Sequence, residues 1–152
     1  LVGSEMCIRD RITAVPREAL GIVWGDVAKV LIKSVETSKG KFHIDDVYKD
    51  VESGMYGLWL IIDDEKEGMN VIAAITTRII QYPSRKALAM DWLGGSRMGE
   101  WLPMAQKTLE GYAKECGCSH LESYGRKAWK RWLGKYGWEP EYIAYRMELG
   151  NG

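Results

Sequence analysis

The spacing of apolar residues changes along this chain, and the change constrains its fold more than any other feature. Between Leu20 and Leu31 apolar side chains recur every three, four and seven residues, which predicts a helix with one buried face. A second, shorter helix is predicted over 44–51. Further along the period becomes two, because 55–63 and 70–82 are β-rich runs joined by a short charged loop. These two runs predict an antiparallel hairpin.

Short strands and helices alternate through the rest of the chain. A first strand is predicted over 12–15, a third hairpin strand over 86–93, and later strands over 120–124 and 141–149. A long helix is predicted to begin near Arg97 and bend at Pro103, or else to follow a loop that reaches Leu102. A short helix over 129–136 ends at Gly137. The order β-α-α-β-β-β-α-β-α-β predicts a mixed α/β (α+β) fold with helices on both faces of one sheet.

Composition excludes several classes of protein. The chain has 152 residues, enough for one domain with a substantial core. Its 21 basic and 21 acidic residues cancel, which argues against a nucleic-acid or membrane-surface binder. No apolar run approaches the roughly 20 residues that cross a bilayer. Three cysteines cannot all pair, which favours a reducing, cytoplasmic location.

The first eleven residues, LVGSEMCIRDR, resemble a translated sequencing adapter found at the ends of metagenomic gene models. We therefore expect residues 1–11 to be a non-native tail without defined packing and residues 12–150 to form the single domain. The tail contains Cys7, which leaves Cys116 and Cys118 in the domain.

The order of elements and a C-terminal motif together resemble the GNAT superfamily of acyl-CoA N-acyltransferases. Many members carry N-x-x-A-x-x-L-Y-x-x-x-G-F on the last helix, and residues 126–138 fall on this pattern with Gly137-Trp138 at the Gly-Phe pair. The resemblance spans 12–149. It implies a mostly antiparallel sheet of six to seven strands flanked by four helices.

The resemblance also implies a site for acetyl-CoA as co-substrate. In this family the pantetheine arm enters a V between the strands that correspond to 86–93 and 119–124, and the pyrophosphate lies on backbone amides of the following glycine-containing loop. Such a loop before a helix favours an anion, because unpaired N–H groups and the helix dipole point at it. The implied coenzyme-binding residues are Trp92, Leu93, Gly94, Gly95, Ser96, Arg97, Met98, Gly99, Arg126 and Lys130.

Four side chains are candidates for moving protons during acyl transfer. Asp91 and Glu122 are carboxylates within strand-like runs, where such residues are disfavoured, and either could deprotonate an ammonium substrate. The alternative is that each faces solvent or pairs with a cation. The family's frequent tyrosine donor aligns with Leu133, which has no proton to give, so Tyr136 or Tyr124 is the candidate donor.

Two further features have competing interpretations. The cations at 126, 127, 130, 131 and 135 form either an anion site or a solvated helix face. Cys116-Gly117-Cys118 with His120 lacks the four ligands of a structural zinc site, so no metal is predicted.

The favoured function is transfer of an acetyl group from acetyl-CoA to an unknown amine by direct attack, by a monomer or homodimer. The alternative is a GNAT-fold binding or structural protein of phage origin with weak or no catalysis.

Overall fold

The computed structural model describes residues 10–64, 70–125 and 129–150. The strands are β1 (Asp10–Ala14), β2 (Gly57–Asp63), β3 (Val71–Gln81), β4 (Lys86–Met90), β5 (Leu93–Gly95) and β6 (His120–Ser123). The helices are α2 (Leu20–Glu36), α3 (Ile44–Glu52), α4 (Met98–Glu115) and α5 (Trp129–Leu133), with the short 3-10 helices η1 (Arg17–Ala19) and η2 (Gly134–Tyr136).

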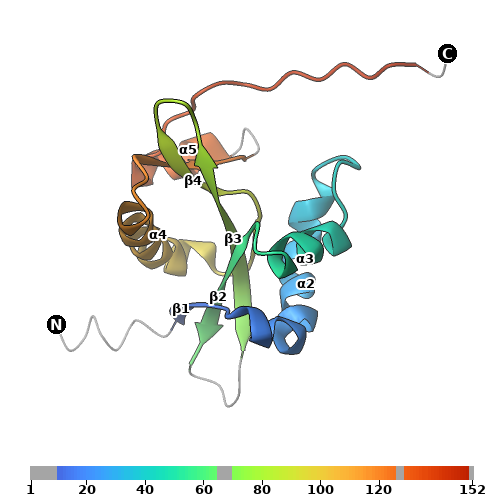
Figure 1. Cartoon of the computed structure of the whole chain (residues 1–152), viewed down its shortest axis with the longest axis vertical. Coiled ribbons are helices and arrows are strands. Elements are labelled where there is room, and N and C mark those ends of the chain that lie inside the picture. Colours follow the sequence, from blue (N-terminus) through green and yellow to red (C-terminus); the bar gives the residue numbers. More distant parts are fainter. Residues whose placement is uncertain (1–9, 65–69, 126–128, 151–152) are drawn as a thin grey trace.

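One six-stranded sheet lies between two layers of helices. Its strand order is β1-β2-β3-β4-β6, with β5 also paired to β3, and only the β4–β6 pair is parallel. Helices α2 and α3 cover one face, and α4 and α5 cover the other (Figure 1). The mixed, mostly antiparallel sheet flanked by four helices is therefore confirmed.

Helix α2 forms because its apolar residues fall on one side. The buried positions recur every three or four residues, as the sequence predicted: Leu20, Val23, Val27, Leu31 and Val35. They pack against α3 and β2 in a first core. A second core on the other face is centred on Trp101 and Leu109 of α4. The sheet is thus buried on both faces.

Strand β1 begins earlier than expected. Asp10 pairs with Asp63, and Arg11 pairs with Ile62 across the β1–β2 ladder. Arg11 also forms an ion pair with Asp64 at 2.9 Å. The prediction that 1–11 lacks defined packing is therefore wrong for its last two residues, whereas residues 1–9 lie outside the described part of the chain.

The strand predicted over 86–93 is two strands separated by a bulge. Arg78 pairs with Ala89, and the next rung joins Ile75 to Leu93, so residues 90–92 oppose only 76–77. At the bulge the Trp92 N–H donates to Oγ1 of Thr76 at 3.1 Å. The Thr76 hydroxyl thus takes the place of a backbone carbonyl as the acceptor, and the strand pairing is interrupted at Asp91 and Trp92.

Helix α4 begins at Met98 and continues through Pro103, so the helix starts near Arg97 and the loop does not reach Leu102. Gly117, with φ +79°, follows the end of this helix, and Gly137, with φ +90°, follows η2. Both glycines take the left-handed conformation that ends a helix, as predicted for Gly137. Among the described helices, none is both long and apolar enough to cross a membrane.

The predicted last strand is wrong. Residues 141–149 have no regular secondary structure, and the segment extends away from the body of the molecule (red in Figure 1). The alternation of apolar residues in this segment is strand-like, but a strand needs a neighbour to accept its hydrogen bonds. In the described part of the chain, no strand pairs with the outer edge of β6.

Candidate functional site

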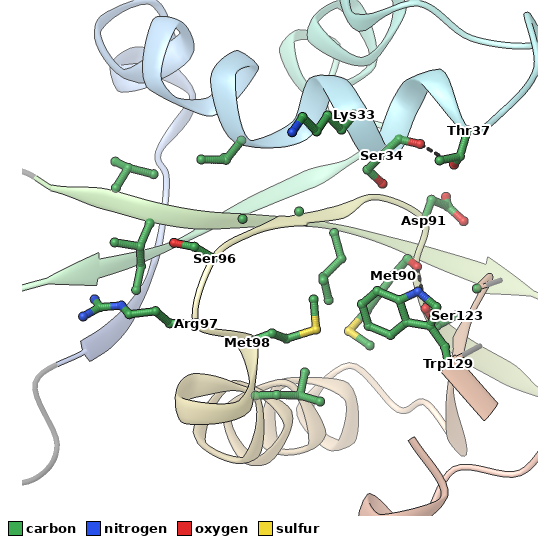
Figure 2. A pocket seen from close by; sticks show the side chains of 18 of the residues that line it. Lys33, Ser34, Thr37, Met90, Asp91, Ser96, Arg97, Met98, Ser123 and Trp129 are labelled. Carbon is green, nitrogen blue, oxygen red and sulfur yellow. Dashed lines mark hydrogen bonds between the residues drawn. The ribbon is translucent and has the colours of Figure 1, made fainter. Parts of the chain in front are cut away.

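A cavity of about 830 Å³ lies where the sheet opens between β5 and the end of β6. This size is typical of small-molecule sites. It is walled by α2 on one side, by the start of α4 on the other and by α5 at the end (Figure 2). Trp129 of α5 lines this end near Ser123 and leaves the cavity open.

The opening arises because β4 and β6 stay together for only four rungs, from Ala87↔His120 to Met90↔Ser123. The hydroxyl of Ser123 then donates to the Met90 carbonyl at 3.2 Å, closing the paired region. Beyond Met90 the chain follows β3 as β5, whereas β6 ends. The cavity is lined by both diverging segments, so the predicted V lies beyond the paired rungs and not along the whole of 86–93.

Strand β5 presents backbone groups to this opening. The backbone N–H of Thr76 donates to the Trp92 carbonyl, and the backbone N–H of Ser96 donates to the Ile72 carbonyl, each at 2.9 Å. In an antiparallel pair, hydrogen-bonded residues alternate with residues that are not hydrogen-bonded. The backbone groups of Gly94 therefore also point towards β3. Those of Leu93 and Gly95 point away from β3. These outward groups lie on the cavity side, where β6 has ended.

The two glycines of β5 are required by packing. A Cβ on Gly94 would lie 2.2 Å from the Val30 carbonyl oxygen of α2. A Cβ on Gly95 would lie 2.3 Å from the Ile72 carbonyl oxygen, and this residue also has φ +139°. The diglycine is thus explained by the close approach of α2 and β3, with or without an anion nearby.

Most of the implied coenzyme-binding residues gather at the cavity. Its lining includes six of them, namely Leu93, Gly94, Gly95, Ser96, Arg97 and Met98. Trp92 does not line it, because its side chain is buried in the first core against Phe42. Gly99 lies within α4, and Lys130 is exposed on α5; neither lines the cavity. Arg126 lies outside the described residues.

Arg97 is held by neighbouring carboxylates. Its guanidinium lies 3.0 Å from both Asp10 and Asp63 and 3.4 Å from Glu100. Its backbone is left-handed, with φ 56°, and it immediately precedes the first turn of α4. Its charge is therefore directed to the β1–β2 end of the sheet and is shared among three acids.

The two candidate carboxylates are both hydrogen-bonded. Asp91 lies between β4 and β5, not within a strand, and accepts from Arg78 at 2.7 and 3.3 Å. Glu122 lies in β6 as expected. It accepts from the Tyr82 hydroxyl at 2.8 Å, and its other oxygen lies 2.8 Å from Nε2 of His120. Both carboxylates project from the sheet face opposite α4.

The two candidate tyrosines lie in different surroundings. Tyr124 follows β6, lines the cavity and is 57% exposed. Partial burial, followed by the nearby Tyr142 and Asp91, raises its pKa above the ordinary value and keeps its proton in place. Tyr136 packs on Trp132 and does not line the cavity. Tyr124 is therefore the donor candidate that the structure brings to the cavity.

Several cavity residues carry no local sequence signal. Lys29 and Lys33 lie one turn apart on α2 and bring two cations to the wall that faces β5. Lysines at this spacing are common on any solvated helix, so the sequence did not single them out. The packing of α2 on Gly94 is what places them at the cavity. Leu133, at the position where the resemblance implies a tyrosine, also lines the cavity.

The Cys116–His120 segment has no metal-site geometry. Cys116 and Cys118 are free thiols, and no cluster of metal-ligating side chains occurs among the described residues. Nδ1 of His120 instead lies 2.8 Å from the Ser119 hydroxyl.

The divided sheet with a cavity at the parting strands defines the GNAT acyltransferase fold. The chain resembles a GNAT family acetyltransferase from Staphylococcus aureus with a TM-score of 0.62 and 10% identity, covering 93% of this chain and 100% of that chain.

Two further solved structures share the fold. Glucosamine-6-phosphate N-acetyltransferase from Arabidopsis thaliana has a TM-score of 0.63 and 16% identity over 93% of this chain and 99% of that chain. An aminoglycoside acetyltransferase from an uncultured soil metagenomic sample, in complex with sisomicin, has a TM-score of 0.65 and 9% identity over 93% and 97%. Protein-family models and curated protein sequences give no match.

Proposed function

We propose that this protein is an N-acyltransferase that moves an acetyl group from acetyl-CoA to an amine by direct attack. One observation carries the proposal: the outward backbone groups of Leu93 and Gly95 face an open cavity at the point where β6 ends. An amide-containing chain such as pantetheine can pair with such an edge as an additional strand would. The structural neighbours named above are acetyltransferases, which supports the same chemistry.

The phosphates of the coenzyme would lie at the start of α4. This end of an 18-residue helix has a left-handed residue before it and no side-chain cap. Its first turn can therefore present N–H groups to an anion, although the N–H of Glu100 donates to the Arg97 carbonyl at 2.9 Å. Lys29 and Lys33 add positive charge on the facing wall. Arg97 would contribute less than expected, because three carboxylates share its charge.

The proton steps are assigned to Glu122 and Tyr124. The amine nitrogen attacks the thioester carbon, the N–C bond forms, and the C–S bond breaks. Glu122 would take the amine proton through a water molecule, and His120 would pass it towards the exposed Ser119 end of the face. Tyr124, which retains its proton, would protonate the departing thiolate. Asp91 would hold Arg78 at the rim of the cavity.

A second function is supported by Leu133. A cavity that holds acyl-CoA but has leucine at the family's donor position could bind without efficient turnover. The protein would then be a binding or structural member of the fold. Either function is consistent with a cytoplasmic location, because the thiols of Cys116 and Cys118 are free.

Acetyl-CoA binding tests the proposal. Free acetyl-CoA at 100 times its dissociation constant should stabilise the fold by about 2.7 kcal/mol, which thermal unfolding will detect. Ser123→Trp should abolish this shift by filling the opening, whereas Thr108→Trp, on the exposed side of α4, should preserve it. No shift at millimolar acetyl-CoA contradicts the first function and favours a binding or structural member of the fold that does not use the coenzyme. Binding without release of free thiol in the presence of a panel of primary amines supports the second function over the first.

A further inference from the structure

The cavity reaches both faces of the sheet, and its wall on the α2 side differs in chemistry from its wall on the α4 side. The α2 wall includes two lysines and two hydroxyl side chains: Lys29, Lys33, Ser34 and Thr37. The wall formed by α4, α5 and the residue after them is mostly apolar: Met98, Leu102, Trp129, Leu133 and Trp138. Figure 2 shows the labelled members of the two sets on opposite sides of the strands. A ligand that reaches the α2 side therefore meets positive charge and hydroxyl groups.

The two lysines carry the charge of this lining that is not neutralised locally. The other charged side chains of the lining are paired, since Arg97 lies 3.0 Å from Asp63 and Asp91 lies 2.7 Å from Arg78. Among the residues that the structure describes, no carboxylate lies within ion-pair distance of either lysine, and the acids of α2 itself do not line the cavity. The α2 wall is therefore positively charged and attracts an anion.

Lys29 and Lys33 lie on the face of the sheet opposite the start of α4, where the proposed function places the coenzyme phosphates. From across the sheet they add to the positive field at those phosphates. On their own side they are placed to contact an anionic group of a second ligand. In acyl transfer to an amine, that second ligand is the amine.

The last turn of α2 supplies oxygen atoms that suit the ammonium end of such a ligand. The Thr37 hydroxyl donates to the Ser34 carbonyl at 2.6 Å, which leaves its oxygen able to accept. In Figure 2 Ser34 and Thr37 project from α2 towards the part of the sheet that carries Asp91. Lys33 and Lys29 lie one and two turns back along the helix, at about 6 and 12 Å from Thr37 along its axis. The helix thus separates an acceptor end from a cationic end.

We infer that the acceptor is a primary amine that also carries an anionic group, a carboxylate or a phosphate. Its ammonium lies at the Thr37 end of the α2 wall, and its anion lies at Lys33 and Lys29. The inference rests on the proposed function, because it names the acceptor of the same reaction. The two groups of the acceptor are about 6–12 Å apart, the length of the wall between them. A second ammonium in place of the anion would lie against two like charges and is disfavoured.

Three acceptors of one chain length and different charge test the inference: aminohexanoate, aminohexanol and hexanediamine, each with its amine on a terminal carbon. Release of free thiol at saturating acetyl-CoA gives kcat/KM for each. Aminohexanoate should exceed aminohexanol by about five- to twentyfold, since one exposed ion pair contributes up to about fivefold. The double variant Lys29→Glu with Lys33→Glu should reverse the order, so that hexanediamine is preferred. The matched variant Lys107→Glu lies on the exposed side of α4, outside the cavity lining, and should keep the wild-type order.

Binding measured without turnover separates this inference from the proposed function. Calorimetric titration of each compound into the protein saturated with coenzyme A gives its dissociation constant. Thiol release with equal values for the three compounds overturns the anionic acceptor and leaves acyl transfer intact. Tighter binding of aminohexanoate without thiol release contradicts acyl transfer and supports the anion site. Binding of none of the three overturns the anion site.

The double variant also decides whether the lysines serve the coenzyme alone. Weaker binding of acetyl-CoA with an unchanged order of the three acceptors would assign both lysines to the coenzyme and overturn the inference. Aminohexyl phosphate then identifies the anion. A phosphate should bind more tightly than the carboxylate of the same chain length if both lysines contact it, because it carries more negative charge.

Discussion

At the residue scale, Glu122 is the most extensively connected of the candidate groups. Its two oxygens contact different partners, the Tyr82 hydroxyl and the His120 ring, and Ser119 extends the chain of contacts from the other ring nitrogen. The four side chains form a continuous hydrogen-bonded path along one face of the sheet. Glu122 does not itself line the cavity, so this path would receive a proton through a bridging water and pass it to the exposed end.

Replacing Glu122 with glutamine removes the proposed proton acceptor and changes the shape very little. We expect Glu122→Gln to lower kcat by about 10²- to 10⁴-fold, the range for loss of a general base, with KM nearly unchanged. Steady-state release of free thiol measures both quantities. The matched variant Glu110→Gln lies on the exposed side of α4 and should retain full activity. Full activity in Glu122→Gln would exclude Glu122 as the base.

The hydrogen bond between Tyr82 and Glu122 also shifts the pKa of Tyr82. Donating to Glu122 raises the pKa of Tyr82 to about 12, from the ordinary 10.0. Because the pKa is higher in the folded state, the contribution to stability is complete below about pH 10 and is lost as the pH rises through about 12. The phenolate absorbance difference between the wild type and Tyr82→Phe should therefore have a midpoint near 12. In a Glu122→Gln background the midpoint should move towards 10, and an unchanged midpoint would exclude the contact in solution.

Sequence alone identified Glu122 and Asp91 but not what each one contacts. A carboxylate within a strand-like run signals an unusual position, whereas its partner comes from another element: Arg78 and Tyr82 lie in or just after β3. Arg97 is the converse case. Its place before a helix indicated an anion site, but Asp63, 34 residues earlier in the chain, takes part of its charge. Pairings over such separations depend on strand register, which periodicity does not specify.

At the element scale, the cavity depends on how β5 is attached to the rest of the sheet. The bulge at Asp91 and Trp92 turns the chain away from β6, and Thr76 holds that bulge with its hydroxyl. Gly94 then allows α2 to approach β5 at backbone distance. The opening between strands is therefore a product of packing on the α2 side of the sheet, although its ligand would lie mainly at the strand edge.

An added methyl group at Gly94 tests this packing. Its Cβ would lie 2.2 Å from a backbone oxygen of α2, so Gly94→Ala should push the helix away and lower the free energy of unfolding by about 1–3 kcal/mol. Gly111→Ala is the matched control, because this site on α4 has nothing within 4 Å. There alanine should stabilise the helix by about 0.5–1 kcal/mol. Urea unfolding measures both. Equal effects of the two substitutions would contradict the close contact.

The elements themselves followed from the sequence wherever local periodicity was sufficient. The buried face of α2, the β2–β3 hairpin and the helix end at Gly137 were all predicted, since each depends on residues that are near in sequence. Two features were not. The break between β4 and β5 requires the hydroxyl of Thr76, and the conformation of residues 141–149 requires knowledge of what pairs with them.

At the scale of the whole molecule, one sheet joins two cores that share no buried side chain. The first lies under α2 and α3, and the second lies under α4 and α5. Both are complete without the C-terminal segment 141–149, whose apolar residues are exposed. The contact of this segment with the body is made near its start, where Tyr142 lies beside Tyr124. Folding of the two cores therefore does not need the apolar side chains of this segment.

This separation predicts that the cores fold without residues 141–150. A chain ending at Pro140 keeps both cores and loses exposed apolar side chains and the contact between Tyr142 and Tyr124. Its free energy of unfolding should therefore lie within about 1 kcal/mol of that of the full chain, the scale of one hydrogen bond. Differential scanning calorimetry should give one cooperative transition for each chain, with melting temperatures within about 2–4 °C of each other. Loss of cooperative unfolding in the shorter chain would show that the segment belongs to a core.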